Sequence, residues 1–360
     1  MGEGNSSAGQ VAARRILHSY LEPFGFGCLS EFPLANHNFK SSKKSIIMSA
    51  DRSSASPAFQ ARRFTDVDEF KFAARKFSVD FTPLARKISV SQLILNLPDF
   101  DVTLVQSFPR LADTQLAANC TAICLTMNDG DLVRFNGIDV EQAYVGIGYG
   151  GSCFSIAERT GGQLASISFT PEIHDRGWPK AGRHFSVFAT TISAHQKLRL
   201  LVSEIMKFAS ESLDVLVVPK TMSAIRDALL LAVDRVFEST NQSWSRRSLH
   251  SASTLAIFQR VEALLMEDLK NPIYSEALAN AAGISVRTLQ DVIMQYRGMS
   301  LHRYLRLKRL WLVRKRLLIA GQTSVKACAL EYGFWHMSDF ARSYQNHFGE
   351  TPSETVAQAR

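Results

Sequence analysis

The last hundred residues of the chain contain an approximate internal repeat, and this repeat restricts the possible folds more than any other feature of the sequence. Each copy carries, in the same order, a small residue, a glycine, a large apolar residue and a second glycine. These are Ala279, Gly283, Leu289 and Gly298 in the first copy, and Ala329, Gly333, Phe340 and Gly349 in the second. A small residue lets two helices cross closely, and a glycine readily adopts the left-handed geometry that ends a helix. Each copy therefore predicts a helix, a tight turn and a second helix, a unit found in many proteins that read DNA.

A serine lies near the start of the second helix in each copy. We predict that Ser285 and Ser338 cap these helices, because a serine hydroxyl can accept a hydrogen bond from a free amide at a helix N-terminus. The large apolar residues should face inward, and the second glycines should end the helices. These features place the first helix-turn-helix unit at about 276–297 and the second at about 326–349.

Positive charge is concentrated in the same region. Residues 285–348 contain eleven Lys and Arg residues and three acidic residues, so this window carries all of the net charge of +8. Such a local surplus indicates a polyanionic partner. The basic stretch 301–320 joins the two units and is predicted to be a single helix about 30 Å long. One turn of B-DNA is about 34–36 Å, so the two units could enter successive major grooves.

The rest of the chain divides into three parts. We expect residues 1–60 to be largely disordered, residues 61–238 to form a β-rich domain that senses an effector or mediates dimerisation, and residues 239–253 to form a polar linker. The DNA-binding domain would then span residues 254–360.

Short runs rich in Ile, Val, Phe and Thr alternate with Asn-Gly and Gly-Gly pairs between residues 77 and 170. Such pairs favour tight hairpins, so the pattern predicts an antiparallel barrel or sandwich. The expected strands are Val90–Leu97, Asp101–Phe108, Thr121–Met127, Leu132–Phe135, Tyr144–Ile147, Cys153–Ala157 and Leu164–Phe169. A helix is expected near Thr65, and two more helices with apolar stripes lie within 192–238. These stripes could pack on the core or contact a second subunit.

The C-terminal region, from about residue 255 to residue 360, resembles the AraC/XylS family of bacterial transcription regulators. The residues that carry the resemblance are Ser285-x2-Thr288-Leu289-Gln290, Tyr304-Leu305-Arg306-x-Lys308-Arg309, Gly333-Phe334, Phe340-x-Arg342 and His347-Phe348-Gly349-x2-Pro352. The resemblance implies an α+β chain. A cupin-like antiparallel β-barrel with flanking helices would precede an all-α domain of two helix-turn-helix units joined by a long helix.

In this family, exposed residues of each second helix reach base edges. The matching base-reading positions are Arg287, Gln290, Asp291, His336, Met337, Ser338 and Arg342. Phosphate contacts and helix caps are expected from Ser285, Thr288, Arg303, Arg306 and Lys308. An arginine suits guanine, a glutamine suits adenine, and a methionine can lie against a thymine methyl. Asp291 departs from the basic residue often found there and would repel phosphate. It could accept from a cytosine amine, or the first unit could contribute less to the affinity.

Two further positions raise questions about the second unit. Thr355 and Val356 stand where the family usually has an aromatic residue and an arginine, which leaves the C-terminal edge in question. Trp335 is predicted to be a packing residue rather than a base-stacking one.

The segment His174–Pro179 follows the last strand, and it could line a pocket or tie the barrel to the helices.

Catalysis is disfavoured. The nine histidines include no H-x-H pair of the kind that metal-dependent barrel enzymes show, so we expect no catalytic residue, no metal and no cofactor. The five cysteines are expected to be reduced thiols of a cytoplasmic protein. No apolar stretch is long enough for a membrane span, and no secretory leader is apparent.

The sequence therefore predicts a sequence-specific, ligand-responsive regulator of transcription, either an activator or a repressor. Its expected partners are double-stranded DNA, RNA polymerase, a small-molecule effector and a second copy bound through 192–238. Two other readings stay open, namely a barrel enzyme with a fused DNA-binding tail and a protein-interaction module with a basic helix.

Overall fold

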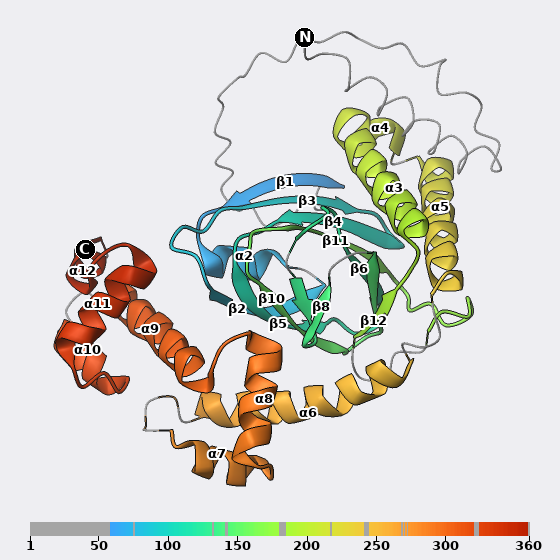
Figure 1. Cartoon of the computed structure of the whole chain (residues 1–360). Coiled ribbons are helices and arrows are strands. Elements are labelled where there is room, and N and C mark those ends of the chain that lie inside the picture. The colour runs from blue at the N-terminus through green and yellow to red at the C-terminus, as the bar shows by residue number, and fades with distance from the viewer. Residues whose placement is uncertain are drawn as a thin grey trace, which may run out of the picture.

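The computed structural model describes residues 58–358 except 75, 132, 141–142, 180–184, 217, 241–244, 268, 270, 272 and 320–323. The predicted disorder of residues 1–60 therefore falls almost entirely outside the described residues. The rest of the chain forms a two-sheet β domain followed by a helical domain that curves around one side of it (Figure 1). The predicted α+β fold class is confirmed.

The β domain consists of two antiparallel sheets. The larger has the order β1 (Phe59–Phe64), β3 (Val90–Asn96), β4 (Phe100–Gln106), β11 (Gln163–Phe169), β6 (Thr121–Thr126), β9 (Tyr144–Gly148) and β12 (Ser186–Ala189). The smaller has the order β2 (Phe77–Pro83), β5 (Arg110–Leu116), β10 (Cys153–Glu158), β7 (Val133–Phe135) and β8 (Ile138–Val140). The sheets face each other as in a cupin, but they remain two sheets and do not close into one continuous barrel.

All seven predicted strands are present, within one or two residues at each end. Five strands were not among them, including β5, which contains Arg110, Asp113 and Gln115 and so lacks an apolar run. The expected helix near Thr65 is α2 (Val67–Ala73), where Asp66 caps the Glu69 amide at 3.0 Å.

Two long helices, α3 (Ile192–Glu211) and α5 (Pro219–Glu238), cover the outer face of the larger sheet (Figure 1). Their apolar stripes are buried in one cluster with strand residues, so the stripes belong to the core of this chain. Arg176 and Trp178 both bind Asp234 of α5, with 2.7 Å between the Trp178 Nε1 and the carboxylate. The segment His174–Pro179 thus ties the β domain to the helices, which is the second of the two roles predicted for it.

The helical domain begins with α6 (Ser245–Glu267), so a helix occupies most of the range predicted to be a linker. The remaining helices are α7 (Ser275–Ala282), α8 (Val286–Arg297), α9 (Leu301–Ile319), α10 (Val325–Glu331), α11 (Met337–Phe348) and α12 (Pro352–Gln358), with the short α4 (Leu213–Leu216) in the β domain. The polar composition near residue 245 suggested a linker, but Leu255, Phe258 and Val261 of α6 are fully buried against α7 and α8.

Candidate DNA-binding site

The two helix-turn-helix units share one turn geometry. In the first, the Ile284 amide donates to the Ala279 carbonyl at 2.9 Å, and Gly283 has a φ of 68°. In the second, the Phe334 amide donates to the Ala329 carbonyl at 2.9 Å, and Gly333 has a φ of 77°. This pairing is typical of a helix that ends at a left-handed residue. The repeat read from the sequence is therefore a structural repeat.

The second helices, α8 and α11, have the predicted ends but only one of the predicted caps. Ser285 accepts from the Thr288 amide at 3.0 Å, as expected. Ser338 was predicted to cap α11, and this is wrong: the N-cap is His336, whose side chain makes no cap hydrogen bond, and Ser338 is the second helical residue. Gly298 and Gly349 both end their helices in left-handed geometry.

The residues predicted to read bases lie on the outer faces of α8 and α11, and for that prediction we call these two helices the reading helices. Arg287, Gln290, Asp291, His336, Ser338 and Arg342 are exposed. Met337 is half-buried because it packs against the core of the second unit, so less of it is available to a thymine methyl. Leu289 and Phe340 are buried on the opposite faces and hold each helix in place. The two helices lie at opposite ends of α9 (Figure 1).

Each reading helix pairs its outermost arginine with a carboxylate. Arg287 Nε lies 3.8 Å from Asp291 Oδ2, and Arg342 Nη1 lies 3.9 Å from Asp339 Oδ1. All four side chains are more than half exposed, so these pairs contribute little stability. They do offset the positive charge that would meet DNA.

We expect Asp291→Asn to tighten binding to random-sequence DNA. The change removes a negative charge from the DNA-facing side of α8, and a screened surface interaction of about 0.5–1 kcal/mol corresponds to a two- to fivefold lower Kd. Fluorescence anisotropy with a random duplex at fixed salt measures the change. Glu211→Gln, at an exposed position at the end of α3, removes the same charge far from α8 and should leave Kd unchanged. An unchanged Kd for Asp291→Asn would show that Asp291 lies away from the phosphates.

The basic residues of α9 serve several different purposes. Arg303 is exposed and stays a candidate for phosphate contact. Arg306 is half-buried and donates to the Asp339 carbonyl and to Ser343, so it braces α11 from within the domain. The prediction for Lys308 is wrong: its side chain is buried, and its ammonium faces Asp80 of β2 at 3.6 Å. Because α9 lies against the β domain, one of its faces cannot reach DNA.

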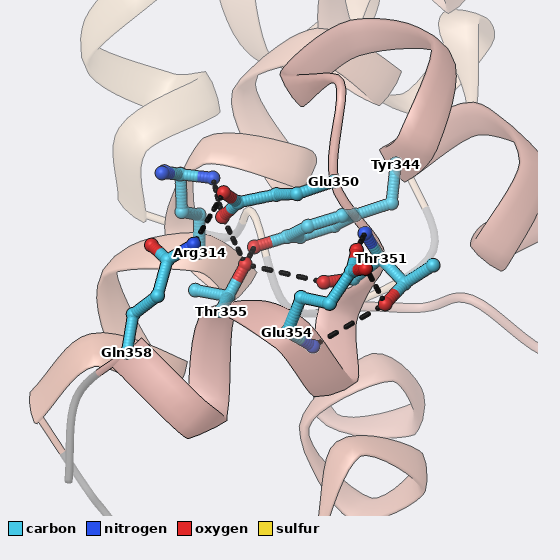
Figure 2. A network of polar contacts seen from close by, with 7 residues as sticks. All are labelled: Arg314, Tyr344, Glu350, Thr351, Glu354, Thr355 and Gln358. Carbon is cyan, nitrogen blue, oxygen red and sulfur yellow. Dashed lines mark hydrogen bonds and ion pairs between the residues drawn. The ribbon is translucent and has the colours of Figure 1, made fainter.

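A polar network closes the C-terminal edge of the second unit (Figure 2). Thr355 is fully buried, and its hydroxyl lies 2.8 Å from the Tyr344 hydroxyl. Glu350 accepts from Arg314 at 2.6 Å and also from Thr355. The residues that depart from the family pattern at this edge therefore take part in an internally satisfied structure.

Trp335 was predicted to be a packing residue, and the structure contradicts this. Its side chain is 68% exposed at the start of α11. The aromatic contact with Phe340 comes instead from Phe334, at 5.0 Å between ring centroids. Trp335 thus stands beside His336 at the exposed N-terminal end of α11.

Arg297, at the end of α8, was missing from the predicted site. Its guanidinium is fully buried and lies 2.6 Å from Asp113 of β5 and 3.1 Å from Glu262 of α6. It also stacks over the rings of Phe258 and Tyr304, 4.5 and 4.9 Å from their centroids. Burial favours the neutral form, but the two carboxylates hold the pKa of Arg297 well above its ordinary value.

Three other arginines of the β domain bind the C-terminal ends of both reading helices. Arg134 donates to the Met294 and Gln295 carbonyls of α8, each at 3.0 Å, and Arg159 donates to the Gly298 carbonyl at 3.5 Å. Arg86 donates to the Asn346 carbonyl of α11 at 3.0 Å. A cation is favourable at a helix C-terminus, where carbonyls lack intrahelical partners. We call Arg86, Arg134 and Arg159 the arginine caps.

These features define the chain as a DNA-binding protein with a tandem helix-turn-helix domain behind a two-sheet β domain. A helix-turn-helix domain family model matches residues 278–358. XylDLEGF operon transcriptional activator 2 of Pseudomonas putida is 31% identical over 125 residues, 34% of this chain and 78% of that protein. The chain belongs to the AraC/XylS family of transcriptional regulators.

Two other similar proteins each match 29% of this chain. XylDLEGF operon transcriptional activator 1 of Pseudomonas putida is 37% identical over 105 residues, which are 29% of this chain and 32% of that protein. The chain thus matches about a third of that relative's length. A crystal structure of a probable AraC family transcriptional regulator from Rhodopseudomonas palustris is 35% identical, covers 29% of this chain and 98% of its own, and has a TM-score of 0.28.

The described residues contain neither a candidate membrane span nor a candidate metal site. None of their helices is both long and apolar enough to cross a bilayer. Nowhere among them do three or more His, Cys, Asp or Glu side chains gather in a way that could hold a metal ion.

Proposed function

We propose that the chain is a cytoplasmic, sequence-specific regulator of transcription that reads two successive major grooves with α8 and α11. The observation that carries the proposal is the duplicated turn geometry at the two ends of α9, with polar side chains exposed on both reading helices. With 19 residues, α9 is about 28 Å long, which is close to one turn of B-DNA.

The same arrangement supports an assignment of roles. Arg287 and Gln290 would read bases from α8, and Arg342 would do so from α11 with His336 and Ser338 beside it. Arg303 and the amides at the N-terminus of α8, capped by Ser285, would hold phosphates. The β domain would bind a small-molecule effector, and we propose no catalytic role for it.

Substitution of Arg342 tests the proposal. We expect Arg342→Ala to lose about 1–3 kcal/mol of binding free energy at the operator, through one base pair, and much less on random DNA. Arg342→Lys is the matched control for charge, because lysine keeps the attraction to phosphate but cannot make the bidentate contact to guanine. Quantitative footprinting on a selected operator measures both variants. Equal losses on operator and random DNA would show that Arg342 does not read sequence.

Further partners follow from the family. We propose that the DNA-bound regulator contacts RNA polymerase and acts as an activator. We also propose that it forms a homodimer through 192–238. Because the apolar stripes of α3 and α5 are buried in this chain, such a dimer would use the outer side of these helices, where Ile192 and Leu200 of α3 are exposed.

A further inference from the structure

A cavity of about 180 Å³ lies between the two sheets of the β domain. That space corresponds to on the order of ten water molecules. Its wall is mostly apolar, with Phe154 and Ile156 from the smaller sheet facing Ile94 and Leu164 from the larger one. A space of this size and character is typical of a site for a small organic molecule.

Three buried polar atoms of the cavity wall make no hydrogen bond among the described residues. Nε of Arg110, on β5, is ion-paired with Glu158, which leaves two atoms without a partner: Nη1 of Arg110 and Oε1 of Gln92, on β3. The two residues are 5% and 3% exposed. A buried polar atom without a partner costs about 1–3 kcal/mol, so a wall that keeps two of them is suited to a molecule that satisfies both. One atom is a donor and the other is an acceptor.

The two atoms belong to the same end of the cavity. The Arg110 guanidinium lies over the rings of Phe70 and Phe108, 5.6 and 5.8 Å from their centroids. These rings form a buried cluster against which Val105 packs. Val105 is the cross-strand partner of Gln92. Arg110 and Gln92 thus border one aromatic cluster.

The charged groups of the wall are already balanced. Arg110 Nε lies 3.0 Å from Glu158 Oε2, in a pair where both side chains are almost completely buried. Lys76 Nζ lies 3.5 Å from Asp101 Oδ2. Burial raises the pKa of Glu158, and the Arg110 charge and the Ser107 hydroxyl favour its ionised form. An anionic ligand would add a third charge to the buried Arg110–Glu158 pair, and the other cation of the wall, Lys76, is already paired with Asp101.

We propose that this cavity binds a neutral, largely apolar molecule of about ten non-hydrogen atoms that carries a carboxamide or an equivalent acceptor–donor pair. Its carbonyl accepts from Arg110 Nη1, and its N–H donates to Gln92 Oε1. The inference deepens the proposed function, because this molecule would be the effector.

Strand β5 connects the cavity to the helical domain. Arg110, Ala112 and Thr114 line the cavity, whereas Leu111 and Asp113 point the other way, into the helical core and to Arg297. Strand β10 alternates in the same way, since Ser155 accepts from Arg297 at 3.1 Å. A molecule seated against Arg110 therefore touches the strand that holds the end of α8.

Four matched probes test the ligand class on the full-length protein. They are 2-phenylacetamide, phenylacetone, phenylacetate and isobutylbenzene, which have the same number of non-hydrogen atoms. Isothermal calorimetry should show the amide binding roughly tenfold or more tighter than the carboxylate, because the anion must be buried without a free cation. The amide should bind about fivefold tighter than the ketone, which accepts from Arg110 but cannot donate to Gln92. The hydrocarbon should bind more weakly than the ketone.

Gln92→Met tests the predicted hydrogen bond to Gln92 without a large change in the packing of the cavity wall. It keeps the shape of the side chain and removes the acceptor, so it should abolish the advantage of the amide over the ketone and leave ketone binding intact. Ser91→Ala, at the neighbouring exposed position, should change neither. The proposal is overturned if the carboxylate binds as tightly as the amide, or if the amide does not bind at millimolar concentration. It is also overturned if the amide still binds more tightly than the ketone in Gln92→Met. Operator binding is measured in parallel, in the absence of the probes. It tests the proposed DNA-binding function independently, so failure of that function can be distinguished from failure of ligand binding in the cavity.

Discussion

Replacing Arg297 with methionine is expected to lower the free energy of unfolding by about 3 kcal/mol, the largest effect among single substitutions at the domain contact. Methionine can fill the space between Phe258 and Tyr304 but leaves Glu262, with a side chain 13% exposed, and Asp113 without their cation. Removing one member of a buried ion pair costs more than the pair contributes, because the remaining charge stays buried. Urea unfolding followed by tryptophan fluorescence measures the loss.

Two matched variants identify the cause of that loss. Arg303→Met removes an exposed arginine from α9 and should change the free energy of unfolding by no more than about 0.5 kcal/mol. Adding Asp113→Asn and Glu262→Gln to Arg297→Met removes the two unpaired charges and should recover at least half of the stability. If the triple variant were no more stable than Arg297→Met, packing rather than charge would be responsible.

Separating the operator half-sites by five extra base pairs is expected to weaken binding about a hundredfold, or by about 3 kcal/mol. Five base pairs turn one half-site to the opposite face of the duplex, and the rigid α9 cannot follow. Ten extra base pairs restore the face but place the half-sites about 70 Å apart, more than twice the length of α9, so binding should not recover. Gel-shift titration on the three operators measures the effect.

The matched control changes the bases of the spacer without changing its length. Affinity should then stay within about twofold, apart from effects of DNA deformability. Recovery of binding at ten extra base pairs would show that a flexible connection joins the two units. Equal binding to all three operators would indicate a contact made through charge alone, as expected for a basic interaction module.

The features that could be predicted from the sequence are those set by local geometry. Gly283, Gly298 and Gly349 end helices where their spacing indicated, because a left-handed residue is needed there. The burial of Leu289 and Phe340 followed from helical periodicity. Ser338 failed as a cap because α11 begins at Met337, two residues earlier than a cap at Ser338 would require, which leaves His336 at that position.

The features that could not be predicted depend on the contact between the domains. Arg297, Arg306 and Lys308 all look like candidates for phosphate contact in a basic sequence, and only the position of the β domain shows that two of them face inward. Strand β5 escaped detection for the same reason. The strand has a cavity on one side and the helical domain on the other, so it carries polar residues on both faces. It therefore lacks the alternation of apolar and polar residues that is expected of a strand with one solvent-exposed face.

The arginine caps have an evolutionary consequence. We expect the tilt of each reading helix to depend on Arg86, Arg134 and Arg159, which belong to the β domain rather than to the helical domain. Substitutions in that part can change which promoters are tolerated while every base-facing side chain stays the same. Lineages of this regulator could therefore diverge in their sets of controlled genes through residues that a comparison of reading helices alone would overlook.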